Sequence, residues 1–80
     1  MLIDSNSTAL LIKIQSNIST PGKLIGTKLK CRRIDGWHNA KISDANNNFV
    51  SFEFNDGSEV PGMPWRMFLA DVKDGNIGLG

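Results

Sequence analysis

The sequence feature that most constrains the fold is an alternating apolar stretch that leads directly into a tight turn. Val50, Phe52 and Phe54 occupy every second position, with polar residues between them. A period of two is typical of a strand that buries one face. The Asp-Gly pair that ends at Gly57 lies where a two-residue hairpin loop needs positive φ. The stretch therefore predicts a β-hairpin, and we expect Pro61 to end its second strand because proline cannot donate to the ladder.

Turn residues divide the rest of the chain into short segments with strand-like patterns. We predict further strands at 9–15, 23–34, 37–43 and 68–72. Pro61 and Pro64 lie three residues apart, which predicts a short 3₁₀ turn at 63–67 rather than a regular strand. Short antiparallel strands can enclose a core in 80 residues only by curling into a small barrel.

The expected fold is all-β, a small SH3-like antiparallel barrel with an additional N-terminal strand. Residues 1–23 form an N-terminal segment that holds the strand 9–15, and residues 24–72 form the barrel. Residues 73–80 contain three glycines and predict a flexible tail.

Composition and charge limit the function classes. The chain carries nine Lys or Arg and eight Asp or Glu, a formal net charge of +1, so nucleic-acid binding would need a local basic patch. Cys31 is the only cysteine, which excludes an internal disulfide and favours a reducing compartment. Neither a signal peptide nor a membrane span is credible, so we expect a soluble, cytoplasmic protein.

No catalytic or metal-binding constellation is visible. His38 is the only histidine, and the sequence places neither a second metal ligand nor a nucleophile beside it. Cys31 has an inward strand position and reads as a structural thiol. We therefore expect no enzyme activity, no metal and no cofactor.

Three segments carry a resemblance to a known family. They are Leu-Lys-Cys-Arg-Arg at 29–33, Asp-Gly-Trp-His-Asn-Ala-Lys-Ile at 35–42, and Phe-Glu-Phe-Asn-Asp-Gly-Ser-Glu-Val at 52–60. With these segments, residues 24–72 resemble a Tudor domain, the SH3-like barrel of chromatin readers and DNA-damage checkpoint proteins. The resemblance implies a non-catalytic module that recognises a peptide or protein partner, including methylated side chains. It also implies a nuclear location if the protein is a eukaryotic chromatin reader.

The resemblance assigns candidate ligand-binding residues. Phe54 and Asp56 match the family pattern, Trp37 or His38 falls at its paired-aromatic position, and Trp65 would supply a further wall. The cage is incomplete, because non-aromatic residues stand at two positions that often carry aromatic ones: Arg33 or Ile34, and Ser58. Each candidate also has a structural interpretation, in which Phe54 fills the core, Asp56 forms the turn and Trp65 plugs the barrel end.

A basic strand face supports an alternative function. Lys28, Lys30 and Arg32 alternate along one face, where phosphates could lie, and Trp37 could stack on bases. The same pattern also fits a solvated face or an edge strand protected by lysines. In the next predicted strand, Trp37, Asn39 and Lys41 alternate with His38, Ala40 and Ile42, and we expect Ala40 and Ile42 to face inward.

The N-terminal segment suggests an assembly. Leu10, Leu11, Ile12 and Ile14 lie outside the barrel and are too apolar to stay exposed. They either add a strand to their own barrel or pair with the same segment of a second chain. Of these two arrangements we expect the homodimer.

Overall fold

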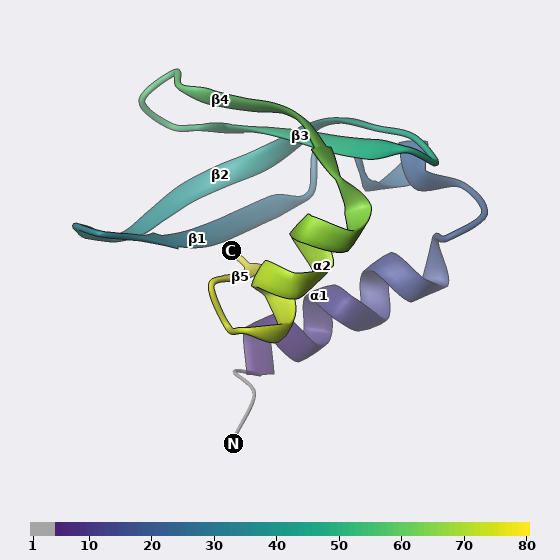
Figure 1. Ribbon diagram of the computed structural model, residues 1–80, viewed down its shortest axis with the longest axis horizontal. Helices are drawn as coiled ribbons and strands as arrows, with labels where there is room; N and C mark the ends of the chain where they lie inside the picture. Colours follow the sequence, from purple (N-terminus) through teal and green to yellow (C-terminus); the bar gives the residue numbers. More distant parts are fainter. Residues whose placement is uncertain (1–4) are drawn as a thin grey trace.

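The computed structural model describes residues 5–80 and consists of one five-stranded antiparallel sheet whose inner face is covered by two α-helices (Figure 1). The elements in chain order are α1 (Ser5–Ser16), the 3₁₀-helix η1 (Pro21–Leu24), β1 (Lys28–Arg33), β2 (Gly36–Ala45), β3 (Phe49–Phe54), β4 (Glu59–Pro64), α2 (Trp65–Lys73) and β5 (Ile77–Leu79). The strand order is β4-β3-β2-β1-β5, so the last strand returns to lie beside the first.

The predicted central hairpin is confirmed, but its connection, residues 55–58, is longer than the predicted two-residue loop. β3 and β4 pair in antiparallel register, and Gly57 in their connection has a φ of +89°. One oxygen of Asp56, Oδ1, accepts hydrogen bonds from the backbone N–H of Ser58 at 2.9 Å and from its hydroxyl at 2.6 Å. The turn is thus held by its own side chains, as short Asp-containing turns commonly are.

The second strand of this hairpin is longer than predicted. β4 continues through Pro61 and ends at Pro64, so our expectation that Pro61 ends it is wrong. β4 is the edge strand of the sheet, where a missing donor costs no ladder hydrogen bond. The backbone N–H of Gly62 instead donates to the hydroxyl of Ser51 at 2.8 Å.

The predicted N-terminal strand at 9–15 is wrong, because this segment is the helix α1. Ser7, Leu10 and Ile14 are its buried residues, and their spacing of three and four is that of one helix face. Ile12, which strand alternation would have buried, is 59% exposed. Leu10 and Ile14 are therefore covered within the chain, and the homodimer remains a prediction.

The 3₁₀ turn predicted at 63–67 and the strand predicted at 68–72 are also wrong. Pro64 closes β4, and α2 begins at the next residue, a place where proline does not interrupt helical hydrogen bonds. Phe68 and Val72, four residues apart, are fully buried on one face of the helix. Packing against the sheet therefore outweighs the strand propensity of this short segment.

The C-terminal residues are part of the sheet rather than a flexible tail. Ile77 and Leu79 of β5 pair with Cys31 and Leu29 of β1, and Ile77 is buried. The hydroxyl of Ser7 donates to the carbonyl of Ile77 at 2.8 Å, which ties α1 to β5. The division into a segment 1–23, a barrel 24–72 and a tail 73–80 is thus not seen in the described residues, which share one core.

The sheet is not closed into a barrel. β4 and β5 lie at opposite ends of the strand order, and α2 connects them. Side chains of both helices join those of the sheet in the core, so the helices supply apolar cover that a closed barrel would draw from its own strands. The buried apolar residues are Leu10, Ile14, Leu24, Leu29, Cys31, Ala40, Ile42, Ala45, Val50, Phe52, Phe68, Val72 and Ile77.

The contact between α1 and β5 generates a stability prediction. A Cβ at Gly78 would lie 3.0 Å from Cβ of Asn6 and 3.2 Å from the backbone nitrogen of Ser7. We expect Gly78→Ala to destabilise the protein by about 1–3 kcal/mol in urea denaturation, because the start of α1 would have to move. Gly22→Ala is the matched control, since a Cβ at Gly22 meets nothing within 4 Å. Equal stability of the two variants would contradict this close packing.

Candidate functional site

The pairing of β1 with β2 decides which side chains share a face. Residues directly opposite each other in an antiparallel pair point to the same side of the sheet. Three such rungs form the outer face of this hairpin, and we call them the outer ladder: Arg32 opposite Trp37, Lys30 opposite Asn39, and Lys28 opposite Lys41. The intervening rungs, which include Cys31 opposite His38 and Leu29 opposite Ala40, belong to the inner face. As predicted, Ala40 and Ile42 are buried.

Trp37 is the aromatic residue of the outer ladder. Its side chain is 48% exposed, and Nζ of Lys30 lies 4.9 Å from the ring centroid. A cation at this distance from an indole face is attracted by the electrons of the ring. Arg32 is exposed on the opposite strand of the same rung. The residues proposed for nucleic-acid binding from sequence, Lys28, Lys30, Arg32 and Trp37, therefore do lie together.

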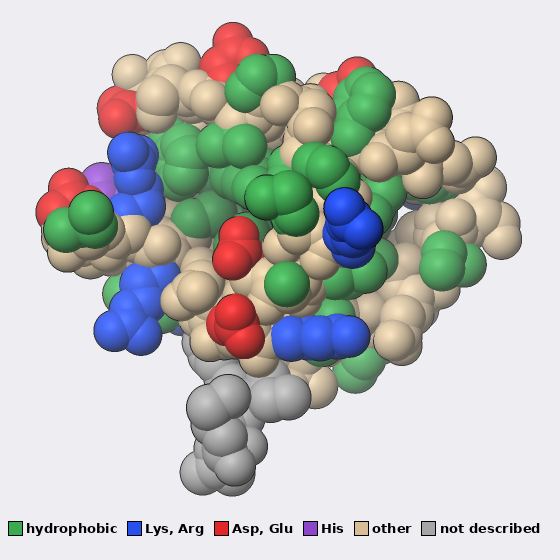
Figure 2. Space-filling view, in the orientation of Figure 1, with side chains coloured by type: hydrophobic (Ala, Val, Ile, Leu, Met, Phe, Trp, Pro, Cys, Tyr) green, Lys and Arg blue, Asp and Glu red, His purple; other side chains and the backbone are tan. Residues whose placement is uncertain are grey.

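Carboxylates also lie on the outer side of the sheet, on β2 at the exposed Asp44 and on β3 at Glu53. Glu53 pairs with Lys41 in the strand register, and its Oε1 lies 3.8 Å from Nζ of Lys41. Glu59 of β4 is the next residue across the sheet. The rungs of Arg32 and Lys30 contain no carboxylate. The nearest one in the adjoining turn is Asp35, whose side chain is 73% exposed. Figure 2 shows Lys and Arg side chains near the tip of this hairpin, at the left of the molecule, with an acidic side chain beside them.

A groove opens beside the outer ladder. Its volume is about 610 Å³, and its lining includes Lys28, Asn39 and Lys41 from two of the three rungs. Asn55 and Gly57, from the turn between β3 and β4, also line it. The groove thus presents amide and ammonium groups together with the carboxylate of Glu53, next to the rung that carries Trp37.

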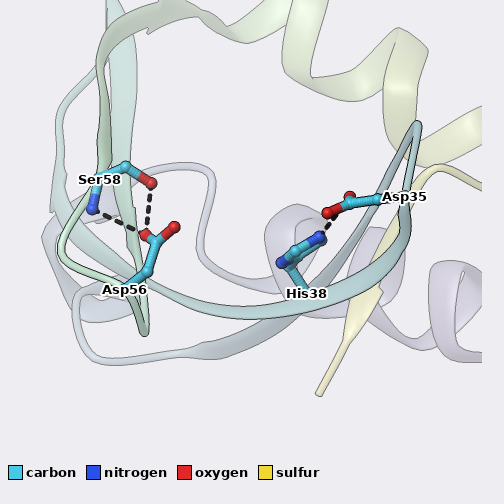
Figure 3. Close-up of polar contacts among 4 residues, drawn as sticks. All are labelled: Asp35, His38, Asp56 and Ser58. Atoms are coloured by element: carbon cyan, nitrogen blue, oxygen red, sulfur yellow. Dashed lines mark hydrogen bonds and ion pairs between the residues drawn. The ribbon is translucent and has the colours of Figure 1, made fainter.

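His38 points to the inner side, away from Trp37. Its Nε2 lies 2.6 Å from Oδ1 of Asp35, a hydrogen bond across the β1–β2 turn (Figure 3). This hydrogen bond is the main cause that holds the pKa of Asp35 below its ordinary value. The ring of His38 also meets Phe54 edge-on, with the centroids 6.2 Å apart. His38 therefore fastens the hairpin turn, and Trp37 and His38 do not form an aromatic pair.

The face of Phe54 is already covered by a cation from the same chain. Cζ of Arg33 lies 4.8 Å from the centroid of the Phe54 ring, and Phe52 packs against Phe54 at 5.8 Å. Asp56 belongs to the other hairpin, where its hydrogen bonds from Ser58 lower the pKa of its carboxyl (Figure 3). These contacts match the structural interpretation of Phe54 and Asp56, as a packing residue and a turn residue.

Trp65 lies on α2 and away from the outer ladder. Its ring packs edge-on against Phe68 with the centroids 5.7 Å apart, and its Nε1 donates to the carbonyl of Asn46 at 2.5 Å. The five candidate ligand residues therefore do not surround one space. Trp37 is on the outer face, His38 and Phe54 are on the inner side, Asp56 is in a turn and Trp65 packs against the core.

Cys31 lines a second depression, which we call the inner hollow. It has a volume of about 320 Å³, and Phe52, Phe54 and Asp71 are among its lining residues. Burial, and then the charge of Asp71, raise the pKa of the Cys31 thiol to about 11. Burial is also the first cause that raises the pKa of Asp71, followed by the charge of Asp74. Cys31 is thus kept in its unreactive thiol form.

Within residues 5–80 no three His, Cys, Asp or Glu side chains come together as metal ligands would. None of the helices in this part of the chain is long and apolar enough to cross a membrane.

Sequence reasoning missed two residues of the outer face, Asn39 and Lys41. The signal was present in the sequence, because alternation through Trp37, Asn39 and Lys41 places all three on one side of β2. The same alternation already separates Trp37 from His38. The contact between the Arg33 cation and the Phe54 ring could not be predicted from the sequence, because it joins the ends of two strands that are not neighbours in the sheet.

The raised pKa of the Cys31 thiol predicts how the rate of its chemical labelling depends on pH. With a thiol pKa raised from 9.0 to about 11, the reactive thiolate at pH 8 is about a hundredfold scarcer than in the unfolded chain. We expect iodoacetamide labelling of Cys31 in the native protein, followed by mass spectrometry, to accelerate up to about pH 11, and labelling in urea to level off near pH 9. Native and unfolded protein reacting equally fast at pH 8 would contradict a buried thiol.

No protein-family model, curated protein or solved structure matches this chain. The resemblance to Tudor domains therefore rests on the three quoted segments alone.

Proposed function

We propose that this protein is a non-catalytic binding module whose outer ladder holds single-stranded nucleic acid. The observation that carries the proposal is the half-exposed ring of Trp37 on the same face as Lys28, Lys30 and Arg32. Aromatic faces stack on unpaired bases, and neighbouring cations contact the phosphates between them.

The local arrangement matters more than the overall charge. A net charge of +1 gives little long-range attraction to nucleic acid, so affinity has to come from cations that sit beside the stacking residue. Arg32 lies directly across from Trp37, and Lys30 lies over its ring. A strand face of this kind suits single strands, whose bases can turn outward, better than a duplex, whose bases are already stacked on each other.

The methylated-peptide interpretation receives less support from the same geometry. It would need Trp37, His38 and Phe54 around one ligand, but strand pairing separates Trp37 from the other two. The ring of Phe54 has Arg33 over its face, as the ring of Trp37 has Lys30, so this contact does not distinguish the two interpretations. For the fold we propose an SH3-like strand order, a meander whose last strand returns beside the first, in a sheet that is not closed.

Salt dependence tests the electrostatic part of the proposal. We expect binding of a fluorescein-labelled oligouridylate, measured by anisotropy, to weaken as salt rises. Arg32→Ala should reduce the slope of log affinity against log salt by about 0.7, the value for one lost phosphate contact on a single strand. Lys73→Ala is the control, since it removes the same charge from α2. A slope that is flat in the wild type, or equal in both variants, would reject the assignment.

Stacking is tested separately at Trp37. Trp37→Ala should cost about 1–3 kcal/mol of binding free energy, as removal of a base-stacking aromatic residue typically does. Met67→Ala is the matched control, because Met67 is an apolar residue of α2 that is 54% exposed. Heparin, which has charge but no bases, should bind the Trp37 variant as well as it binds the wild type. An equal loss in both variants would contradict the stacking role.

A further inference from the structure

The outer ladder has a regular step. Side chains on one face of a strand repeat every second residue, about 6.6 Å apart. Arg32, Lys30 and Lys28 follow this step on β1. Their partners on β2 differ from one another in chemistry: they are Trp37, Asn39 and Lys41. The step is similar to the length of one nucleotide in an extended single strand. Each rung can therefore serve one nucleotide, with a cation from β1 for its phosphate.

The three partners on β2 offer three kinds of contact. Trp37 provides a ring, which stacks on any base and discriminates little. Asn39 provides an amide, which has both a donor and an acceptor and so can pair with the edge of a base. Lys41 provides a second cation for the third phosphate, although Glu53 lies 3.8 Å away and competes for it.

The groove gives the middle base a place to enter. Asn39 is exposed and lines the groove of about 610 Å³, together with Asn55 from the β3–β4 turn. The backbone N–H of Asn55 donates to the carbonyl of Asn39 at 3.1 Å, so these two residues are held side by side. Two amide residues that line one groove are suited to reading a flat, hydrogen-bonding ligand such as a base.

We infer that the outer ladder holds three nucleotides, one on each rung, and that Asn39 reads the edge of the middle base. This inference rests on the proposed function and makes it more specific. The first base stacks on Trp37, the middle base enters the groove at Asn39, and the third phosphate lies between Lys28 and Lys41. Asn39 is thus the residue that determines base preference, and Trp37 and the cations supply affinity.

The test uses four trinucleotides with uridine at both ends and A, C, G or U in the middle. Each competes with the labelled oligouridylate for the wild-type protein. We expect the best and worst middle bases to differ about fivefold or more, the smallest effect typical of an amide that pairs with a base edge. Because the middle nucleotide stays in the middle whichever way the strand runs, the test does not depend on strand direction.

Asn39→Ala should reduce this difference to less than about twofold, and Asn39→Thr, which suits a strand, should do the same. Asn47→Ala, the same change in an exposed loop, should retain the wild-type preference. Chain length gives a second readout: the gain in affinity from two to three nucleotides should exceed the gain from three to four.

Equal binding of all four trinucleotides by the wild type, or an unchanged preference in the Asn39 variants, would overturn the inference. The proposed function would survive either result as long as binding still depended on Arg32 and Trp37. Failure of every oligonucleotide to bind, by contrast, would reject the proposed function and the inference together.

Discussion

The pairing of β1 with β2 in a fixed register is the interaction on which the rest of the structure depends. Pairing of Arg33 with Gly36 leaves a two-residue turn, and the hydrogen bond from His38 to Asp35 closes it. Gly36 has a φ of +121°, which L side chains rarely adopt. A slip of one residue would turn Trp37 toward the core and Ala40 toward solvent, at a large cost in apolar burial. The turn therefore decides which face of the sheet can bind.

The helices determine which face of the sheet is exposed. α1 and α2 cover the inner face with residues such as Leu10, Phe68 and Val72, all fully buried. With this cover the sheet can remain open, and its outer face extends across β1, β2 and β3 as one surface. An extended surface suits a chain-like ligand, whereas the smaller inner hollow already has Arg33 over Phe54.

Much of the sheet could be predicted from the sequence, because alternation of period two is a local signal. Val50, Phe52 and the Asp-Gly turn indicated the central hairpin, although Glu53 pairs with Glu59 and not with Val60, as a two-residue loop would require. The helices could not be predicted in the same way. Leu10, Ile12 and Ile14 fit a strand as well as a helix, and only contact with β5 and α2 decides between them. β5 has three residues, too few for its pattern to stand out before its partner β1 is known.

In the candidate site, too, relations within one strand could be predicted from the sequence, and relations between strands could not. Lys28, Lys30 and Arg32 were recognised as one face because they lie on one strand. Their relation to Asn39 and Lys41 depends on pairing between strands, which the sequence specifies only once the turn is correctly placed. The resemblance to Tudor domains drew attention to Trp37 and His38 as a pair, although adjacent residues on a strand point to opposite faces.

The most direct measurement is a ¹⁵N-edited NMR titration of the whole chain with a short oligouridylate. If the outer face binds, the largest amide shifts will lie at residues 28–32 and 37–41, with smaller ones at Asn55 and Gly57. The amides of α2 and of Asp71 in the inner hollow will move little. Shifts centred on the inner hollow or the helices, with the outer ladder unchanged, would contradict a binding face formed by β1 and β2.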